Sequence, residues 1–337
     1  MLIKKVEVKG KLRHLSGFKK QEADPRDFLF RSSPELTGAS VVTSANLLQN
    51  NLPIVDQGEL GSCTANALAG LVGINEVTSW KKVQQVRTNP VPTVVSMVIL
   101  SPDGKTLEVI STIKNFIVPV PTPAPAPAPT PTPSSPILAS RLYEYYNARF
   151  IEGTVSEDSG ATIRDTIKAA AQYGVAHESL WPYNIAQFAV KPPQSVYSEA
   201  AMHLIASYHS INDGDLSSIK AAIISGFGVE FGFNVYSSFL SDAVANTGIV
   251  PLPNVSAEAL EGGHAVVIVG FDDATQNFLV RNSWGIDWGL LQTGTSAPIF
   301  NSSRLTAPGY FLMPYSYVGN LSLASDFWVV VSNVLNS

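Results

Sequence analysis

Apolar residues follow a helical period in the first half of the chain. After residue 63 the apolar positions recur three or four residues apart, at Ala67, Leu68, Leu71, Val72, Ile74 and Val77. Further helices are predicted at 140–147, at 163–173 and at 216–225, the last with Asp215 as its N-cap. The tyrosines of 140–147 share a face and are expected to pack between helices.

The second half of the chain changes to short apolar runs, which are typical of buried strands. Strands are predicted at 229–235, 265–270, 277–280, 309–312 and 327–331. The pattern therefore predicts an α+β protein with two lobes, a helical lobe followed by a β-rich lobe, with a cleft at their junction.

Residues 80–136 differ in composition from the chain on either side. Two β-favouring runs, 94–100 and 107–113, flank an Asp-Gly pair that suits a tight turn, so a β-hairpin is expected. Because an isolated hairpin is marginally stable, it should rest on the body of the protein or on a partner. The proline-rich tract that ends at Pro136 predicts a polyproline II strut, either a spacer or a ligand for a proline-binding groove.

Cys63 is the only cysteine, so it is either a reactive thiol or a small buried apolar side chain. The glycine-rich, polar stretch before it and the helical pattern after it place it in the first turn of a helix. Unpaired N–H groups and the helix dipole favour a thiolate there. The local pattern therefore indicates a nucleophile.

Among five histidines, only His264 combines a glycine approach with a strand, because Gly262 and Gly263 precede it and an apolar run follows. On its own it would read as a hydrogen-bonded core histidine. Asn282, however, follows the next predicted strand eighteen positions later. Two adjacent strands could bring the Asn282 amide oxygen beside His264, where it would hold the imidazole in the tautomer that faces sulfur.

These residues resemble the motifs of the papain-like cysteine peptidases. Gln57 stands six positions before Cys63, and an Asn-Ser-Trp-Gly turn begins at Asn282. The resemblance implies a papain-like two-lobed α+β fold, with Cys63 as nucleophile and His264 as general base and acid. It further implies that Asn282 orients His264, that Gln57 and the Cys63 N–H form the oxyanion hole, and that Trp284 shields the histidine–asparagine bond.

Spacing along the chain is longer than this family leads one to expect. Cys63 precedes His264 by 201 residues and Asn282 by 219, against roughly 130–150 in the family. Removing the 57 residues of 80–136 leaves 144 and 162. An insertion at 80–136, after the catalytic helix, explains most of the excess.

The resemblance also implies a set of substrate-binding residues: Gly160, Ala161, Gly232, Gly262, Gly263 and Trp284. The segment that ends at Gly160 and Ala161 would pair its backbone with the substrate. Ala161 departs from the glycine that the family usually has there. Because Ala161, Gly232 and Gly262 are small, the pocket for the side chain two residues before the scissile bond should be roomy and accept leucine or an aromatic.

Charge is distributed unevenly along the chain. Residues 1–33 hold nine Lys/Arg and four Asp/Glu, a net of +5; the whole chain is −5, so the remainder carries −10. We expect residues 1–35 to form a basic segment that serves as an inhibitory propeptide of a catalytic domain at 36–337, with Phe28 or Phe30 as an apolar plug of the cleft. The alternative is a basic tail that packs on the back of the body.

Composition limits the other interpretations. The chain can form no internal disulfide, has no apolar core of a signal peptide near residues 1–9 and has no apolar run long enough to span a membrane. These features favour an intracellular, reducing compartment. The absence of a basic aromatic stripe gives no reason to expect nucleic acid, and the scattered histidines show no metal-site spacing, so neither a cofactor nor a metal is expected.

Three functional hypotheses remain open from the sequence. The leading one is an endopeptidase that cleaves polypeptides through a Cys63 thioester and is made in a self-inhibited form; an occluding loop could also make it an exopeptidase. The second is an amidase, transpeptidase or ligase that uses the same residues. The third is a non-catalytic binding protein whose insertion at 80–136 recruits a protein partner.

Overall fold

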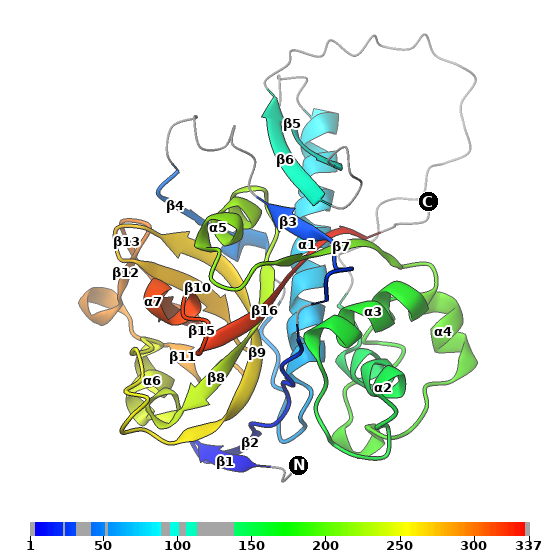
Figure 1. Cartoon of the computed structure of the whole chain (residues 1–337), viewed down its shortest axis with the longest axis horizontal. Helices are drawn as coiled ribbons and strands as arrows, with labels where there is room; N and C mark the ends of the chain where they lie inside the picture. Colours follow the sequence, from blue (N-terminus) through cyan, green and yellow to red (C-terminus); the bar gives the residue numbers. More distant parts are fainter. Residues whose placement is uncertain are drawn as a thin grey trace.

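Two lobes meet along the first long helix of the protein (Figure 1). The computed structural model describes residues 4–22, 24–31, 42–50, 53–88, 95–100, 106–112 and 138–333. Helices gather on one side and most strands on the other, as the hydrophobic pattern predicts. None of the described helices is both long and apolar enough to cross a bilayer.

The helical lobe consists of α1 (Cys63–Thr88), α2 (Arg141–Glu152), α3 (Ile163–Tyr173) and α4 (Gln194–Ala200). Side-chain caps define two of these starts, because Ser140 accepts from the Tyr143 N–H and Thr162 from the Asp165 N–H. The predicted helices at 140–147 and 163–173 are confirmed. The tyrosines of α2 are buried between helices, as expected.

One mixed sheet forms most of the other lobe, in the strand order β15-β10-β9-β8-β16-β7-β3-β6-β5, with β4 paired to β9. Its strands on this side are β4 (Ser44–Asn46), β7 (Ile205–Ile211), β8 (Val229–Tyr236), β9 (Leu260–Asp272), β10 (Asn277–Arg281), β15 (Tyr310–Pro314) and β16 (Ala324–Asn333). All five strands predicted in the second half are confirmed. Their apolar side chains form the main core against α1 and α5 (Leu216–Ile224), which Asp215 caps as predicted.

Short elements complete this lobe around the ends of the sheet. They are α6 (Asp242–Thr247), α7 (Tyr315–Val318), β11 (Gly289–Leu290), β12 (Ile299–Phe300), β13 (Ser303–Arg304) and β14 (Ala307–Pro308). Single turns of 3-10 helix lie at Leu48–Asn50, Ile185–Gln187, Ser237–Leu240 and Gly294–Ser296.

The hairpin predicted within residues 80–136 is confirmed. β5 (Val95–Leu100) pairs antiparallel with β6 (Thr106–Thr112), and β6 pairs in parallel with β3 (Leu29–Arg31). The hairpin therefore rests on the body by extending the main sheet. The proline-rich tract lies outside the described residues.

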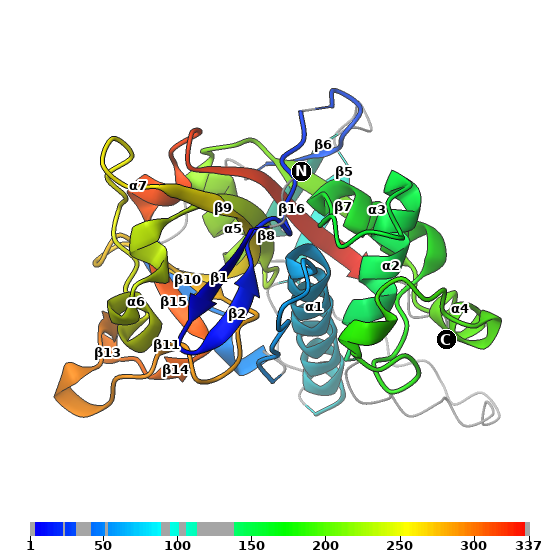
Figure 2. The same ribbon diagram turned by 90° about the horizontal axis from the view of Figure 1, so that it is seen from below.

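The N-terminal residues begin with a separate hairpin of β1 (Lys5–Val8) and β2 (Lys11–His14). Seen from below, this hairpin and the chain that follows it lie over the junction between α1 and the sheet (Figure 2). The chain then joins the main sheet through β3, which pairs with β7. The described residues from 4 to 31 thus cross from one face of the lobe junction into the body's own sheet.

Candidate active site

Cys63 is the first residue of α1, and its side chain is fully buried. The helical ladder opens directly before it, where the Asn66 N–H donates to the Ser62 carbonyl at 3.0 Å. The loop before it is held by Asp158, whose carboxylate accepts from the Gly61 N–H at 2.9 Å. Cys63 therefore lies in the first turn, as predicted, where the helix dipole favours negative charge on sulfur.

His264 lies on β9 and Asn282 directly follows β10, and the pairing of these two strands brings the residues together, as their spacing predicts. The His264 Nε2 and Asn282 Oδ1 atoms are 2.8 Å apart. An amide oxygen there accepts from Nε2–H, which leaves Nδ1 as the basic nitrogen. Nδ1 is buried and has no hydrogen-bond partner within the described part of the chain. It is the imidazole atom that remains for a thiol proton.

Trp284 covers one face of this imidazole. The two rings stack with centroids 5.0 Å apart and planes inclined by 29°. Because Trp284 is itself fully buried, it keeps water away from the His264–Asn282 hydrogen bond. This is the position that the resemblance implies for it.

Gln57 is buried one loop before Cys63, and both ends of its amide are fixed. Its Oε1 accepts from the Ser283 hydroxyl at 2.6 Å, and its Nε2 donates to the Leu60 carbonyl at 3.0 Å. A side-chain amide has two N–H donors, so one remains for a further acceptor. Since Ser283 directly follows Asn282, the same turn positions both Asn282 and Gln57.

Burial sets the protonation of the two reactive groups. It raises the pKa of the Cys63 thiol to about 12, although the N–H of Ala265, the neighbour of His264, opposes the shift. It also lowers the pKa of His264 to about 4, against the hydrogen bond with Asn282. In this closed arrangement the pair is therefore a neutral thiol and a neutral imidazole at neutral pH.

The residues that close the site are 14–19, here called the cleft segment. Its backbone bonds to both lobes: Gly263 N–H donates to Leu15 O at 2.8 Å, and Ala161 N–H donates to Gly17 O at 2.9 Å. Lys19 N–H in turn donates to Ala161 O at 3.1 Å. Two of the predicted substrate-binding residues thus hold a peptide backbone, and that backbone belongs to the chain itself.

Gly17 lies directly against the Cys63 sulfur. A Cβ atom at this position would stand 2.8 Å from Cys63 Sγ and 2.9 Å from the Gly61 carbonyl oxygen, closer than such contacts allow. Across the cleft, a Cβ at Gly160 would stand 2.4 Å from Ser16 O, and Gly160 has a φ of +71°. Glycine at both positions therefore permits the close approach of the cleft segment.

Ala161 departs from the family's usual glycine without disturbing this pairing. Both of its backbone polar groups bond to the cleft segment, while its side chain is fully buried in a cluster with Leu60, Ala65 and Leu142. The methyl group points into the helical lobe and leaves the backbone free to pair.

The Phe18 side chain lies against small residues of the predicted substrate-binding set. A Cβ on Gly232 would fall only 2.0 Å from its ring, and one on Gly263 would fall 3.0 Å from it. Phe18 is 7% exposed. Gly262 lies beside Leu15, whose carbonyl oxygen would be 2.2 Å from a Cβ there. The Phe18 ring thus lies where any side chain on Gly232 or Gly263 would meet it.

The prediction that Phe28 or Phe30 plugs the cleft is wrong. Phe30 is buried in β3, and Phe28 is 45% exposed and contacts the edge of the His209 ring. By residue 28 the chain has left the cleft and joined the sheet, so neither ring can reach Cys63. In the sequence, Phe28 and Phe30 belong to an apolar run with Leu29, whereas Phe18 stands alone beside a glycine.

Charged side chains tie the N-terminal residues to the body. Arg13 pairs with Asp56 and donates to the Trp284 carbonyl at 2.8 Å. The other ion pairs are Lys4–Glu261, Lys5–Glu59, Lys11–Asp56, Lys11–Asp287, Lys19–Glu152 and Asp27–Arg164. The basic N-terminal segment therefore pairs mainly with carboxylates of the acidic body. It lies at the cleft rather than on the back of the body.

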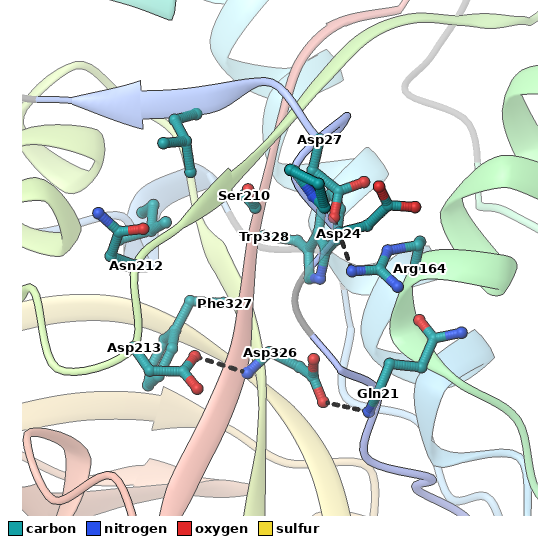
Figure 3. Close-up of a pocket in the computed structure, with 13 residues that line it drawn as sticks. Gln21, Asp24, Asp27, Arg164, Ser210, Asn212, Asp213, Asp326, Phe327 and Trp328 are labelled. Carbon is teal, nitrogen blue, oxygen red and sulfur yellow. Dashed lines mark hydrogen bonds and ion pairs between the residues drawn. The ribbon is translucent and has the colours of Figure 1, made fainter.

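A cavity of about 490 Å³ lies where the N-terminal segment leaves the cleft (Figure 3). Asp27 binds Arg164 there at 2.6 Å, and Asp326 accepts from the Gln21 N–H at 3.1 Å. The Asp326 N–H donates to Asp213 at 3.0 Å. Burial, with the neighbouring Asp213 charge, raises the pKa of Asp326 to about 6.

The fold and this site together define a two-lobed α+β protein with a cysteine, a histidine and an asparagine at the lobe junction. The profile of the papain family cysteine proteases matches residues 155–294, which include His264 and Asn282. The peptidase C1-like protein of Acanthamoeba polyphaga mimivirus is 36% identical over 290 residues, which cover 84% of this chain and 71% of that protein. The chain belongs to the papain family of cysteine proteases.

Solved structures agree with this assignment. Xylellain, a cysteine protease from Xylella fastidiosa, superposes with a TM-score of 0.66 at 30% identity and covers 96% of this chain and 98% of its own. Procathepsin L2 from the larval midgut of Tenebrio molitor superposes with a TM-score of 0.55 at 16% identity, over 94% of this chain and 77% of its own. The second likeness concerns the fold alone.

Proposed function

We propose that this protein is a cysteine endopeptidase that hydrolyses peptide bonds through a thioester on Cys63 and is made in a self-inhibited form. The observation that carries the proposal is the His264–Asn282 hydrogen bond beneath Trp284, which leaves His264 Nδ1 unpaired next to the strand backbone that contacts the Cys63 sulfur. A buried basic nitrogen with a fixed tautomer is what a thiol nucleophile requires.

The reaction follows from these positions. In the open cleft, Nδ1 of His264 takes the Cys63 proton, and sulfur attacks the substrate carbonyl carbon. The free N–H of Gln57 and the Cys63 N–H stabilise the oxyanion. His264 then returns the proton to the leaving amine as the C–N bond breaks. Water, deprotonated by His264, attacks the thioester, and the acid and the thiol are released.

The cleft segment blocks this reaction in two ways. Gly17 covers the Cys63 sulfur, and Phe18 occupies the side-chain pocket. The Gly17 carbonyl is bonded to the Ala161 N–H, so it does not point its oxygen at the donors of Gln57 and Cys63. The segment is thus held as an occupant of the cleft without being placed for attack.

The occupant also suggests the preferred substrate. Because an aromatic ring fits between Gly232 and Gly263, we expect peptides with phenylalanine, tyrosine or leucine two residues before the scissile bond to be cleaved best. A survey of peptides that vary only at this position measures the preference. A preference for a charged residue there would contradict it.

Labelling with an epoxide inhibitor of papain-like peptidases, read by intact mass, tests the proposal on the full chain. We compare the parent with Phe18→Ala, and we use Phe28→Ala as the matched control because Phe28 lies outside the cleft. A single adduct, absent from Cys63→Ala and formed faster in Phe18→Ala than in Phe28→Ala, is the expected result. If the parent, Phe18→Ala and Phe28→Ala all form no adduct, the result would favour a non-catalytic binding protein.

Acyl transfer to an amine uses the same residues, so hydrolysis needs a separate readout. Peptide products from Phe18→Ala, formed with and without an added amine, are compared by mass. Free carboxylic acids in both reactions support a peptidase, whereas an amide of the added amine as the main product would make the protein a transferase.

A further inference from the structure

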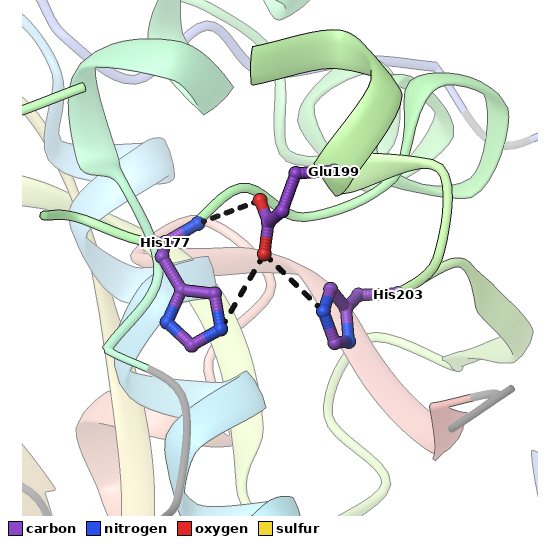
Figure 4. Close-up of side chains that lie close together, drawn as sticks. All are labelled: His177, Glu199 and His203. Carbon is purple, nitrogen blue, oxygen red and sulfur yellow. Dashed lines mark hydrogen bonds and ion pairs between the residues drawn. The ribbon is translucent and has the colours of Figure 1, made fainter. Parts of the chain in front are cut away.

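Two histidines and a glutamate converge on the helical lobe (Figure 4), and none of the three is among the candidate active-site residues. His177 follows α3, Glu199 belongs to the last turn of α4, and His203 follows that helix. Their spacing in sequence shows no metal motif, because His177 comes from a different loop. Folding brings one ligand atom from each residue within 4.8 Å of the others.

The distances suit a tetrahedral ion. The Glu199 Oε1 atom lies 3.4 Å from His177 Nε2 and 3.3 Å from His203 Nε2. Zinc bonds of about 2.0–2.1 Å to nitrogen and oxygen, at tetrahedral angles, separate neighbouring ligand atoms by about 3.3–3.4 Å. The two distances from Glu199 Oε1 to the imidazole nitrogens thus match two of the ligand–ligand distances in a tetrahedral zinc site.

Hydrogen bonding alone explains this arrangement poorly. Charge-assisted N–H to carboxylate bonds are about 2.7–2.9 Å long, and both contacts of Glu199 Oε1 exceed that range. The other oxygen, Oε2, accepts from the His177 backbone N–H at 3.3 Å. This second contact orients the carboxylate, so that one oxygen faces the backbone and the other faces both imidazoles.

The cluster is accessible and partly ordered by its surroundings. The side chains of His177, Glu199 and His203 are 33%, 18% and 19% exposed. The His203 carbonyl accepts from the Val175 N–H at 3.1 Å, and His177 pairs with Ala139, just after the insertion. An ion here would tie the loop after α3 to the end of α4, with an open position for water.

We propose that His177, Glu199 and His203 form a binding site for a zinc-type divalent cation, which fastens these two parts of the helical lobe together. Two imidazoles and one carboxylate are a ligand set that Zn²⁺ accepts with water as the fourth ligand. The site is separate from the catalytic cleft and does not depend on the proposed peptidase activity.

Titration calorimetry with Zn²⁺ tests this on the untagged full chain carrying Cys63→Ser, which removes the thiol as a competing zinc ligand. We expect one site per chain, and in a separate thermal melt a melting temperature raised by about 4 °C at a hundredfold excess over Kd. Glu199→Gln, His177→Ala and His203→Ala should each weaken binding at least tenfold. Ser198→Ala, an exposed neighbour on α4, is the matched control.

Cobalt provides the geometric readout. Co²⁺ bound at the site should give the intense visible absorption of a four- or five-coordinate ion, and Glu199→Gln should abolish it. Glu199→Gln preserves the size of the side chain, so an unchanged melting temperature without metal separates ligation from folding. Equal Zn²⁺ affinity in the parent and the three ligand variants, or no binding at micromolar Zn²⁺, would overturn the proposal.

Discussion

At the scale of single residues, the most informative position is Gly17, because only a hydrogen fits between its Cα and the Cys63 sulfur. Gly17→Val should push the cleft segment out. Overpacking of this kind costs about 1–3 kcal/mol, which corresponds to roughly a fivefold to hundredfold shift toward the open state. The initial rate on a small fluorogenic peptide should rise accordingly.

Lys20→Gln provides the comparison for Gly17→Val, since it changes an exposed residue directly after the cleft segment. Its rate should stay close to that of the parent. If Gly17→Val is no faster than Lys20→Gln, the cleft segment does not limit access to the nucleophile.

The buried thiol makes a second prediction at this scale. Burial raises the pKa of Cys63 to about 12 in the closed chain, so the thiolate fraction is small at neutral pH and rises only in alkali. Phe18→Ala should let water reach the pair, so that His264 can carry the thiol proton. Alkylation by iodoacetamide should then level off at a lower pH than in the parent. Coincident pH profiles would contradict this account.

At the scale of elements, the sequence predicted what depends on local periodicity and failed where the answer depends on tertiary register. The limits of α3 follow from a helical pattern that ends at Gly174, and β9 and β10 follow from apolar runs. Nothing local distinguishes Phe18 as the residue that meets Gly232. The three residues His177, Glu199 and His203 likewise meet only because separate loops converge.

The start of β16 gives a prediction about an irregularity in the pairing of this strand with β8, between Ser325 and Trp328. Asp326 has a φ of +59°, a conformation that asparagine tolerates well, and its pKa is raised to about 6 by burial beside Asp213. The folded state therefore binds this proton more tightly than the unfolded state, and stability falls as pH rises from about 4 to about 6. Above about pH 6 the ionised Asp326 carboxylate destabilises the folded state.

Asp326→Asn should remove this cost and keep an oxygen for the Gln21 N–H. We expect a gain on the order of 1–2 kcal/mol in the free energy of unfolding at pH 7.5, after allowance for solvent screening, and little gain at pH 4. Thermal melts in the Cys63→Ser background measure it, with the exposed Glu157→Gln as control. An equal gain at both pH values would point to the backbone conformation rather than to the charge.

At the scale of the whole molecule, the chain separates its charge so that a segment of net +5 lies on a body of net −10. The contacts are mostly exposed ion pairs, such as Lys5–Glu59 and Lys11–Asp287. Each contributes little, about 0–1 kcal/mol, and salt weakens such pairs. Several together are still enough to shift a balance between a closed and an open cleft by about tenfold.

Raising the ionic strength should therefore increase the activity of the full chain toward a neutral peptide, by about threefold to tenfold between low and high salt. The Phe18→Ala chain should respond less, because its cleft is already open. This contrast separates release of the segment from a general effect of salt on the reaction. If both chains respond equally, the ion pairs position the N-terminal residues without controlling access, and closure depends on Gly17 and Phe18 alone.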